Sequence, residues 1–282
     1  MNRGPDADPE LAATRLRADG TTLPDCPGVT LTPDVCHGVP VTHFRPDDVD
    51  SDDRVLLWFH GGGYRLGSAR GFGRWNAGLA ARCGVDVVSV DYRLAPEHPF
   101  PEALIDAVLA YTAVAASSRR VVVGGESAGG GLAAALLLVL ADRDLPAPVG
   151  GVLCSPWLDL SNSSTSFTEN ASTDALFPRA AADRAAALYL VGHPPTDPYA
   201  SPLLGDWALQ PPLLLQASTA ENLRDDAVGL AASAPGGRLE LYDGVPHAWH
   251  IGYPEAPRSV EAAESIARFV NEIACPTEVQ RT

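Results

Sequence analysis

Apolar runs alternate with longer helix-forming stretches from residue 54 onward, and this alternation restricts the chain to few folds. The expected strands are RVLLWFH (54–60), VDVVSVDY (85–92), RVVVGG (120–125), PVGGVLCS (148–155), PPLLLQAS (211–218) and GRLELYDG (237–244). Helices are expected near 73–83, 101–117, 127–142, 179–191, 223–234 and 256–274. Continuous apolar strands separated by helices are typical of a mostly parallel sheet covered on both faces. The sequence therefore predicts an α/β fold of this kind.

Two stretches depart from the alternation. Residues 1–38 contain one short helical pattern followed by chain rich in Pro, Asp and Gly. Residues 156–210 place the polar runs SNSSTSFTENAST and GHPPTDPYASPLLGDW on either side of a helix. We expect both stretches to be additions that lie over the sheet.

The charge of the chain narrows its classes of partner. Its 282 residues include 20 Lys and Arg against 35 Asp and Glu, a formal net charge of −15, with no basic cluster. This balance argues against nucleic acid or an anionic membrane as a partner. The run LAAALLLVLA (132–141) is too short to span a membrane, and the N-terminus has no apolar signal core.

The cysteines and histidines give no sign of a metal site or a disulfide framework. The five cysteines are odd in number, scattered and without C-x-x-C spacing. None of the seven histidines shows helical ligand spacing with a carboxylate partner. We therefore predict reduced thiols, a cytoplasmic location and no metal or other cofactor.

The strongest chemical signal is VVVGGESAGGG, residues 121–131. Within it, residues 125–129 read G-x-S-x-G, the nucleophile elbow, in which a sharp strand-to-helix turn holds the oxygen of Ser127 above the sheet. Such a turn needs small neighbours, and no bulky residue follows Ser127 until Leu132. A tight turn in which a serine merely caps a helix has the same pattern, so the turn alone leaves both interpretations open.

A second glycine run, FHGGGYRLGS (59–68), follows the first strong strand. Three consecutive glycines allow backbone N–H groups to turn toward a substrate oxygen. A phosphate-binding loop is the alternative, but the Gly-Lys-Ser/Thr of a P-loop is missing. His60 opens the run, and we expect its ring to brace the loop.

A serine nucleophile needs a base and an acid that follow it in the order Ser, acid, His. His247 and His250 follow the last strand, in YDGVPHAWH. His247 leaves that strand on a Gly-Val-Pro turn, as a loop-borne base requires, whereas His250 is flanked by Trp and Ile and is expected to pack. The candidate acids after strand 211–218 are Glu221, Asp225 and Asp226.

Five motifs occur in a family order. They are HGGGY (60–64), DYRLAPEHPFPEALIDA (91–107), GESAGG (125–130), SPWLDL (155–160) and LYDGVPHAW (241–249). In these motifs the chain resembles the hormone-sensitive-lipase-like carboxylesterases of the α/β-hydrolase superfamily, over about residues 38 to 272. The resemblance implies an α/β-hydrolase fold in which residues 1–38 form an N-terminal cap segment. Residues 39–282 then form the catalytic domain, with a cap insertion near 156–210.

The resemblance also implies the roles of individual residues. Ser127 is the expected nucleophile and His247 the base, and the backbone N–H groups of Gly61, Gly62 and Ala128 are the expected oxyanion hole. ENLRDD aligns with the family's Asp-Pro-Leu-Arg-Asp without gaps, which places Glu221 at the acid position. The chain departs from the family at Glu126, where the elbow usually has Asp.

The expected function is hydrolysis of small, short-acyl esters by a Ser-His-Glu triad, with no cofactor. Two alternatives stay open: a dehydratase, cyclase or acyl transferase acting on a specialised metabolite, and a non-catalytic receptor for a small molecule. The expected partner is a small-molecule ester, with neither nucleic acid nor membrane. The last helix and the neighbouring strand could form an interface between two copies in a homodimer.

Overall fold

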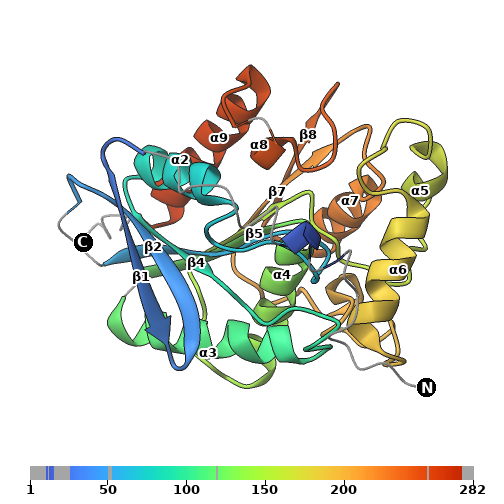
Figure 1. Cartoon of the computed structure of the whole chain (residues 1–282), viewed down its shortest axis with the longest axis horizontal. Coiled ribbons are helices and arrows are strands. Elements are labelled where there is room, and N and C mark those ends of the chain that lie inside the picture. The colour runs from blue at the N-terminus through green and yellow to red at the C-terminus, as the bar shows by residue number, and fades with distance from the viewer. Residues whose placement is uncertain are drawn as a thin grey trace, which may run out of the picture.

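A computed structural model describes residues 11, 13–15, 26–49, 53–118, 120–252 and 254–274. In these residues eight strands form one sheet in the order β1-β2-β4-β3-β5-β6-β7-β8 (Figure 1). They are β1 (Val29–Cys36), β2 (Val39–Pro46), β3 (Arg54–Phe59), β4 (Asp86–Val90), β5 (Arg120–Glu126), β6 (Gly150–Cys154), β7 (Leu213–Ser218) and β8 (Gly237–Tyr242). β2 pairs antiparallel with β1 and β4, and the other neighbours are parallel.

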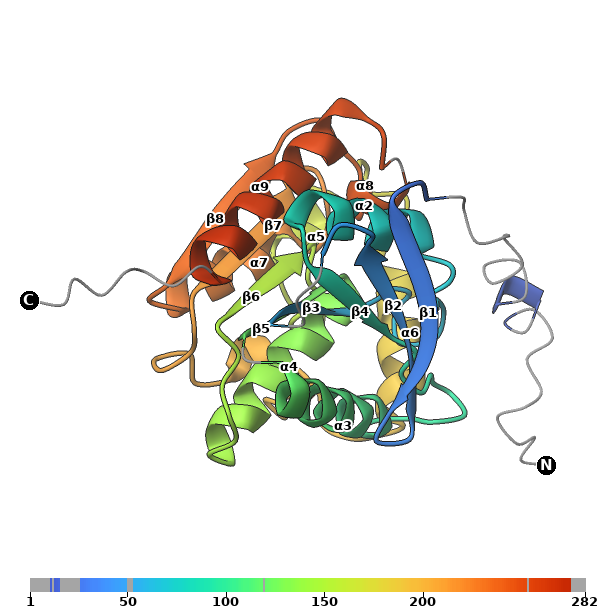
Figure 2. The same cartoon turned by 90° about the vertical axis from the view of Figure 1, so that its left-hand side faces the viewer.

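Helices cover both faces of this sheet. They are α2 (Gly73–Cys83), α3 (Glu102–Ser117), α4 (Ala128–Asp142), α5 (Ser166–Glu169), α6 (Arg179–Leu190), α7 (Arg224–Ser233), α8 (Trp249–Gly252) and α9 (Pro257–Ala274), with a 3₁₀ turn η2 at Pro202–Leu204. Figure 2 shows α2 and α9 on one face and α3 and α4 on the other. Successive residues of a strand point to opposite faces. Accordingly Leu56 of β3 joins the core cluster of α2 and α9, and Leu57 joins that of α3 and α4.

The predicted α/β fold is confirmed, but one part of the predicted cap is wrong. Residues 29–36 were expected to lie over the sheet, and they form its edge strand β1 instead. Its sequence VTLTPDVC contains Pro33 and Asp34, which are rare in central strands. An edge strand tolerates a proline because one of its sides has no neighbour that needs an N–H. Most residues before 26 lie outside the described part of the chain.

The insert at 156–210 carries α5, α6 and η2. α5 and α6 lie beside each other at the right of Figure 1. α6 packs against the loop that follows β3. The Tyr189 ring of α6 stacks on the Tyr64 ring of that loop, with centroids 3.9 Å apart. The insert thereby reaches the glycine run that follows β3.

Candidate active site

Ser127 occupies a strained turn between β5 and α4. Its backbone has φ 54° and ψ −119°, a conformation that residues other than glycine rarely adopt. The turn is held by the Ser127 N–H, which donates to the Cys154 carbonyl at 2.9 Å. A Cβ at Gly125 would lie 2.3 Å from the carbonyl oxygen of Gly129, so the tightness of the turn requires glycine there. The pattern G-x-S-x-G therefore has the geometry that it predicts.

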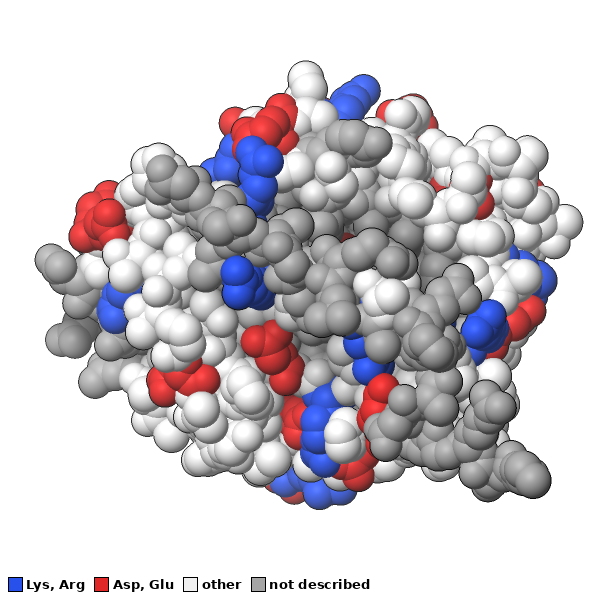
Figure 3. All heavy atoms as spheres, viewed as in Figure 1, with Lys and Arg blue, Asp and Glu red and all other residues white. Residues whose placement is uncertain are grey.

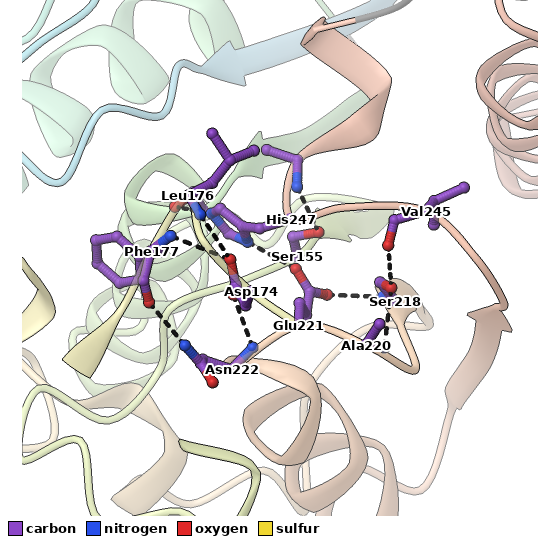
Figure 4. Close-up of polar contacts among 12 residues, drawn as sticks. Ser155, Asp174, Leu176, Phe177, Ser218, Ala220, Glu221, Asn222, Val245 and His247 are labelled. Atoms are coloured by element: carbon purple, nitrogen blue, oxygen red, sulfur yellow. Dashed lines mark hydrogen bonds and ion pairs between the residues drawn. The ribbon is translucent and has the colours of Figure 1, made fainter. Parts of the chain in front are cut away.

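His247 and Glu221 reach Ser127 from two other loops. His247 Nε2 lies 3.0 Å from Ser127 Oγ, and its Nδ1 lies 2.6 Å from Glu221 Oε2. The other oxygen of Glu221 accepts the Ser218 N–H at 2.7 Å, which fixes the carboxylate (Figure 4). All three side chains are buried. They meet because β5, β7 and β8 are parallel and their carboxyl ends lie at one edge of the sheet.

The surroundings of His247 favour its protonated form. Burial lowers its pKa, but the hydrogen bond and negative charge of Glu221 outweigh burial, and the charges of Glu126 and Asp174 add to the effect. The pKa of His247 is therefore raised above its ordinary value. An imidazole in this setting can take a proton from a hydroxyl and hold it beside a carboxylate.

The other candidate acids lie elsewhere. Asp225 accepts the Ser166 N–H at 2.8 Å and pairs with Arg224. Asp226 accepts the N–H groups of Leu158 and Asp159 at 2.8 and 3.1 Å. Both carboxylates therefore hold the insert against α7, and of the three candidates the structure brings Glu221 to His247.

His250, the second candidate base, is buried away from Ser127. Its Nε2 lies 3.1 Å from Gln216 Oε1, and its ring stacks on Trp249 at 3.7 Å. Burial, with the nearby charge of His247, lowers the pKa of His250 to about 3. A packing role was expected for it, and the structure agrees.

The glycine run after β3 lies beside Ser127, and its three glycines differ in what they face. The Gly61 N–H hydrogen-bonds to the carboxylate of Glu126 and so is already engaged. Gly62 and Gly63 line the same cavity as Ser127, and Gly61 does not. In this geometry the Gly61 N–H faces Glu126, and the assignment of Gly61 to the oxyanion hole stays a prediction. Gly63, the third glycine of the same run, lines the cavity and was not among the predicted donors.

Ala128 and His60 flank Ser127 and this glycine run in the sequence. Ala128 begins α4 directly after Ser127, and the first N–H groups of a helix have no acceptor within the helix. The N–H of His60 Nδ1 donates to the Gly61 carbonyl at 2.8 Å, and the His60 ring stacks on Tyr92 at 4.4 Å. His60 braces the loop, as its position in the sequence predicts.

Glu126 itself is a buried carboxylate beside Ser127. Burial, together with the negative charge of Glu221, raises its pKa to about 7, and His247 and the Gly61 N–H act in the opposite direction. A Cβ on Gly61 would lie 2.0 Å from Glu126 Oε2. The longer side chain at the elbow is thus accommodated by the absence of a side chain at Gly61.

A cavity of about 360 Å³ opens over Ser127 and His247. Its walls are mostly apolar and include Leu66, Phe72, Leu176, Phe177, Trp249 and Ile251. Leu176 and Phe177 come from the insert, and no sequence motif marked them. An apolar cavity with a few polar groups at one end is typical of a site for a small molecule.

Within the described residues, no three or more His, Cys, Asp or Glu side chains are arranged to hold a metal ion. The helices of that same part of the chain are all too short or too polar to cross a membrane.

Comparison with known proteins decides the family. The model of a family described as having the alpha/beta hydrolase fold matches residues 56–251. The chain belongs to the α/β-hydrolase family. An acetyl-hydrolase of Streptomyces hygroscopicus is 38% identical over 226 residues, which are 78% of this chain and 76% of the relative. An esterase of Acinetobacter venetianus is 32% identical over 79% of this chain and 76% of the relative.

Solved structures narrow the family further. An esterase of the bacterial hormone-sensitive lipase family superimposes on this α/β-hydrolase with a TM-score of 0.89 at 35% identity. The match covers 98% of this chain and 94% of that one. This α/β-hydrolase therefore falls in the hormone-sensitive-lipase-like branch, and it is a carboxylesterase-type hydrolase.

Proposed function

We propose that this α/β-hydrolase cleaves small carboxylic esters with Ser127 as nucleophile, His247 as base and Glu221 as the acid that orients the base. One observation carries the proposal: the hydrogen-bonded series from Ser127 Oγ to His247 at 3.0 Å and from His247 to Glu221 at 2.6 Å. The series ends in a cavity large enough for a small ester. A non-catalytic receptor would have no need to keep this geometry.

The reaction runs in two halves. Ser127 Oγ attacks the ester carbonyl carbon while its proton passes to His247 Nε2, and Glu221 stabilises the imidazolium that forms. The negative oxygen of the tetrahedral intermediate accepts the N–H groups of Gly62, Gly63 and Ala128. His247 then donates its proton to the departing alcohol. Water attacks the acyl-enzyme, with His247 again as base, and releases the acid and free Ser127.

The proposed substrates have short acyl groups. Leu176 and Phe177 line part of the cavity of about 360 Å³. They belong to the insert, which we propose is a small cap. The Streptomyces relative is named an acetyl-hydrolase, in keeping with a small acyl group. A pocket gains ~0.8 kcal/mol for each methylene it can bury and loses rate once the chain no longer fits.

The test is a panel of aryl esters of increasing acyl length, combined with a fluorophosphonate label located by peptide mapping. We expect ester hydrolysis and a label on Ser127. Ser127→Ala should lose about 10⁴-fold or more in kcat, because it removes the nucleophilic oxygen. The fold should be unchanged, since the substitution removes little packing. Ser233→Ala is the matched control, since Ser233 is exposed at the end of α7.

Two outcomes would contradict the proposal. One is a Ser127→Ala variant that keeps a tenth of the wild-type activity. The other is a protein that takes the label but hydrolyses none of the esters, which would favour the dehydratase, cyclase or acyl-transferase alternative.

A further inference from the structure

Asp174 is a buried carboxylate of the insert that the proposed reaction does not use. It precedes α6 and is only 3% exposed. Its Oδ1 accepts the N–H groups of Leu176 and Phe177, both at 3.1 Å. Its Oδ2 accepts the N–H of Asn222 at 2.8 Å. One carboxylate therefore joins the wall of the cavity to the residue that directly follows Glu221.

A second bond runs between the same two segments in the opposite direction. The Asn222 side-chain amide donates from Nδ2 to the Phe177 carbonyl at 3.0 Å. Figure 4 shows Asp174 and Asn222 facing each other, with the backbone of Leu176 and Phe177 turned toward them. Asp174 and Asn222 thus form a reciprocal clamp between the insert and the acid loop.

The clamp holds two residues that lie beside His247 or line the cavity over Ser127. The Phe177 ring stacks nearly parallel to the His247 ring, with centroids 5.6 Å apart and 21° between their planes. Leu176 and Phe177 both line the cavity over Ser127. Of the two, Phe177 is buried and Leu176 is 65% exposed, at the rim of the cavity.

We propose that Asp174 is a positioning residue that, through this clamp, sets the longest acyl group the site accepts. The proposal rests on the ester hydrolysis proposed above. Backbone N–H groups bound by an ionised carboxylate are held more strongly than by a neutral acceptor. The clamp therefore keeps Phe177 against the His247 ring and Leu176 at the rim of the cavity, and so limits the room for longer chains.

Asp174→Asn breaks the clamp with little change of volume. An amide has one oxygen, so it cannot accept at both of the positions that Oδ1 and Oδ2 now occupy. Whichever way the amide turns, its NH₂ group faces a backbone N–H at 2.8 or 3.1 Å. The link to the acid loop or the link within the insert is then lost.

The experiment compares kcat/KM for aryl octanoate and aryl butanoate in each variant. In Asp174→Asn we expect the octanoate-to-butanoate ratio to rise about tenfold, because a pocket that opens by a few methylenes gains that order of discrimination. Asn222→Ala removes only the return bond and keeps the backbone N–H for Asp174, so a smaller rise is expected. Asn222→Ala also tests the clamp if Asp174→Asn does not fold.

Asp159→Asn is the matched control. Asp159 is also in the insert and accepts hydrogen bonds from Ser161 and Ser163, at 2.7 to 2.8 Å from their hydroxyls. It holds a turn of the insert and lines no part of the cavity. A loss of stability in Asp159→Asn with an unchanged acyl ratio is expected.

The pH profile gives a second readout that general loosening of the structure would not move. The charged groups that raise the pKa of His247 are Glu221, Glu126 and Asp174. Asp174→Asn removes one negative charge, so the acid limb of kcat/KM should move to lower pH, and in Asn222→Ala it should stay in place.

Each result separates the two proposals. If the wild type hydrolyses no ester, the proposed function fails and the clamp proposal fails with it. If the wild type is active and both clamp variants keep the wild-type acyl ratio, the clamp proposal alone is overturned. A fall in activity that is equal for all acyl lengths overturns it as well, because it points to a structural role only.

Discussion

At the scale of single residues, only one of the three candidate acids after β7 contacts His247. Glu221 lies three residues after the end of β7 and reaches His247 Nδ1 at 2.6 Å. Asp225 and Asp226 belong to α7 and face the insert. A glutamate can serve here because the acid need only accept the imidazole N–H and stabilise the imidazolium.

Comparison of Glu221→Gln with Asp225→Asn tests this assignment. Glu221→Gln should lower kcat about 10³-fold or more, because a neutral amide no longer stabilises the imidazolium. Asp225→Asn loses a partly exposed ion pair with Arg224, and kcat should change less than about threefold. Steady-state kinetics on an aryl butanoate measure both. A larger kcat loss in Asp225→Asn would transfer the acid role to Asp225.

Glu126 should make the stability of the protein depend on pH. Because its pKa is raised from 4.5 to about 7, the folded state keeps the proton at pH values where the unfolded chain has lost it. The carboxylate therefore destabilises the fold increasingly as the pH rises from about 4.5 to 7, and fully above that range.

Glu126→Gln should remove this penalty while its oxygen still accepts the Gly61 N–H. At about pH 8 the variant should gain up to about 3 kcal/mol in the free energy of unfolding over the wild type, and at about pH 4 little. Urea unfolding at the two pH values measures the difference. An offset that is the same at both pH values would show that Glu126 does not titrate in this range.

At the scale of elements, the elbow depends on close packing of α4 against β3. A Cβ on Gly129 would lie 2.0 Å from the Phe59 carbonyl oxygen and 2.5 Å from that of His60. Both are backbone atoms at the end of β3, so neither can swing aside. The first turn of α4 therefore has no room for any side chain on this face.

Gly129→Ala should destabilise the protein by about 3 kcal/mol, the upper range for overpacking in a core. Gly78→Ala in α2 is the matched control, because its Cβ would meet only the end of the Arg82 side chain, at 3.1 Å. Since alanine is the better helix former, Gly78→Ala should be neutral or slightly stabilising. Thermal unfolding of the two variants decides, and equal melting temperatures would contradict the packing argument.

At the scale of the whole molecule, the surface charge and the size of the insert affect whether the protein acts on dissolved esters or at a lipid surface. The net charge is −15. Figure 3 shows Lys and Arg scattered among acidic residues on this face rather than gathered into a patch. Such a surface disfavours adsorption to anionic lipid. The described part of the insert has α6 as its longest helix, 12 residues, with no long apolar face for a lid that opens at an interface.

The whole enzyme should therefore behave as an esterase rather than as a lipase. We expect kcat/KM on aryl esters to peak between acetyl and hexanoyl and to fall before decanoyl, because a cavity of about 360 Å³ is at the small end of the range for ligand sites and must also hold the aryl group. The rate on dissolved esters should not jump when an emulsion forms. Efficient hydrolysis of long-chain triglyceride emulsions with such a jump would refute this expectation.

The sequence by itself determined the features that depend on near neighbours in the chain. The alternation of apolar runs and helices was sufficient for the α/β fold, because strand and helix periods are local properties. The elbow around Ser127 and the loop that presents His247 were also readable, since both need glycine or proline at fixed offsets. The edge strand β1 was not, because its polar pattern has meaning only beside β2.

Only the tertiary structure decided how separate segments share their polar groups. The Gly61 N–H, in the loop after β3, hydrogen-bonds to the carboxylate of Glu126 at the end of β5, and no local pattern contains that pairing. The link from Asp174 to Asn222 likewise joins residues 48 positions apart. A buried hydrogen-bonding group takes whichever partner the fold brings within reach, so the choice of partner is made only when the chain is packed.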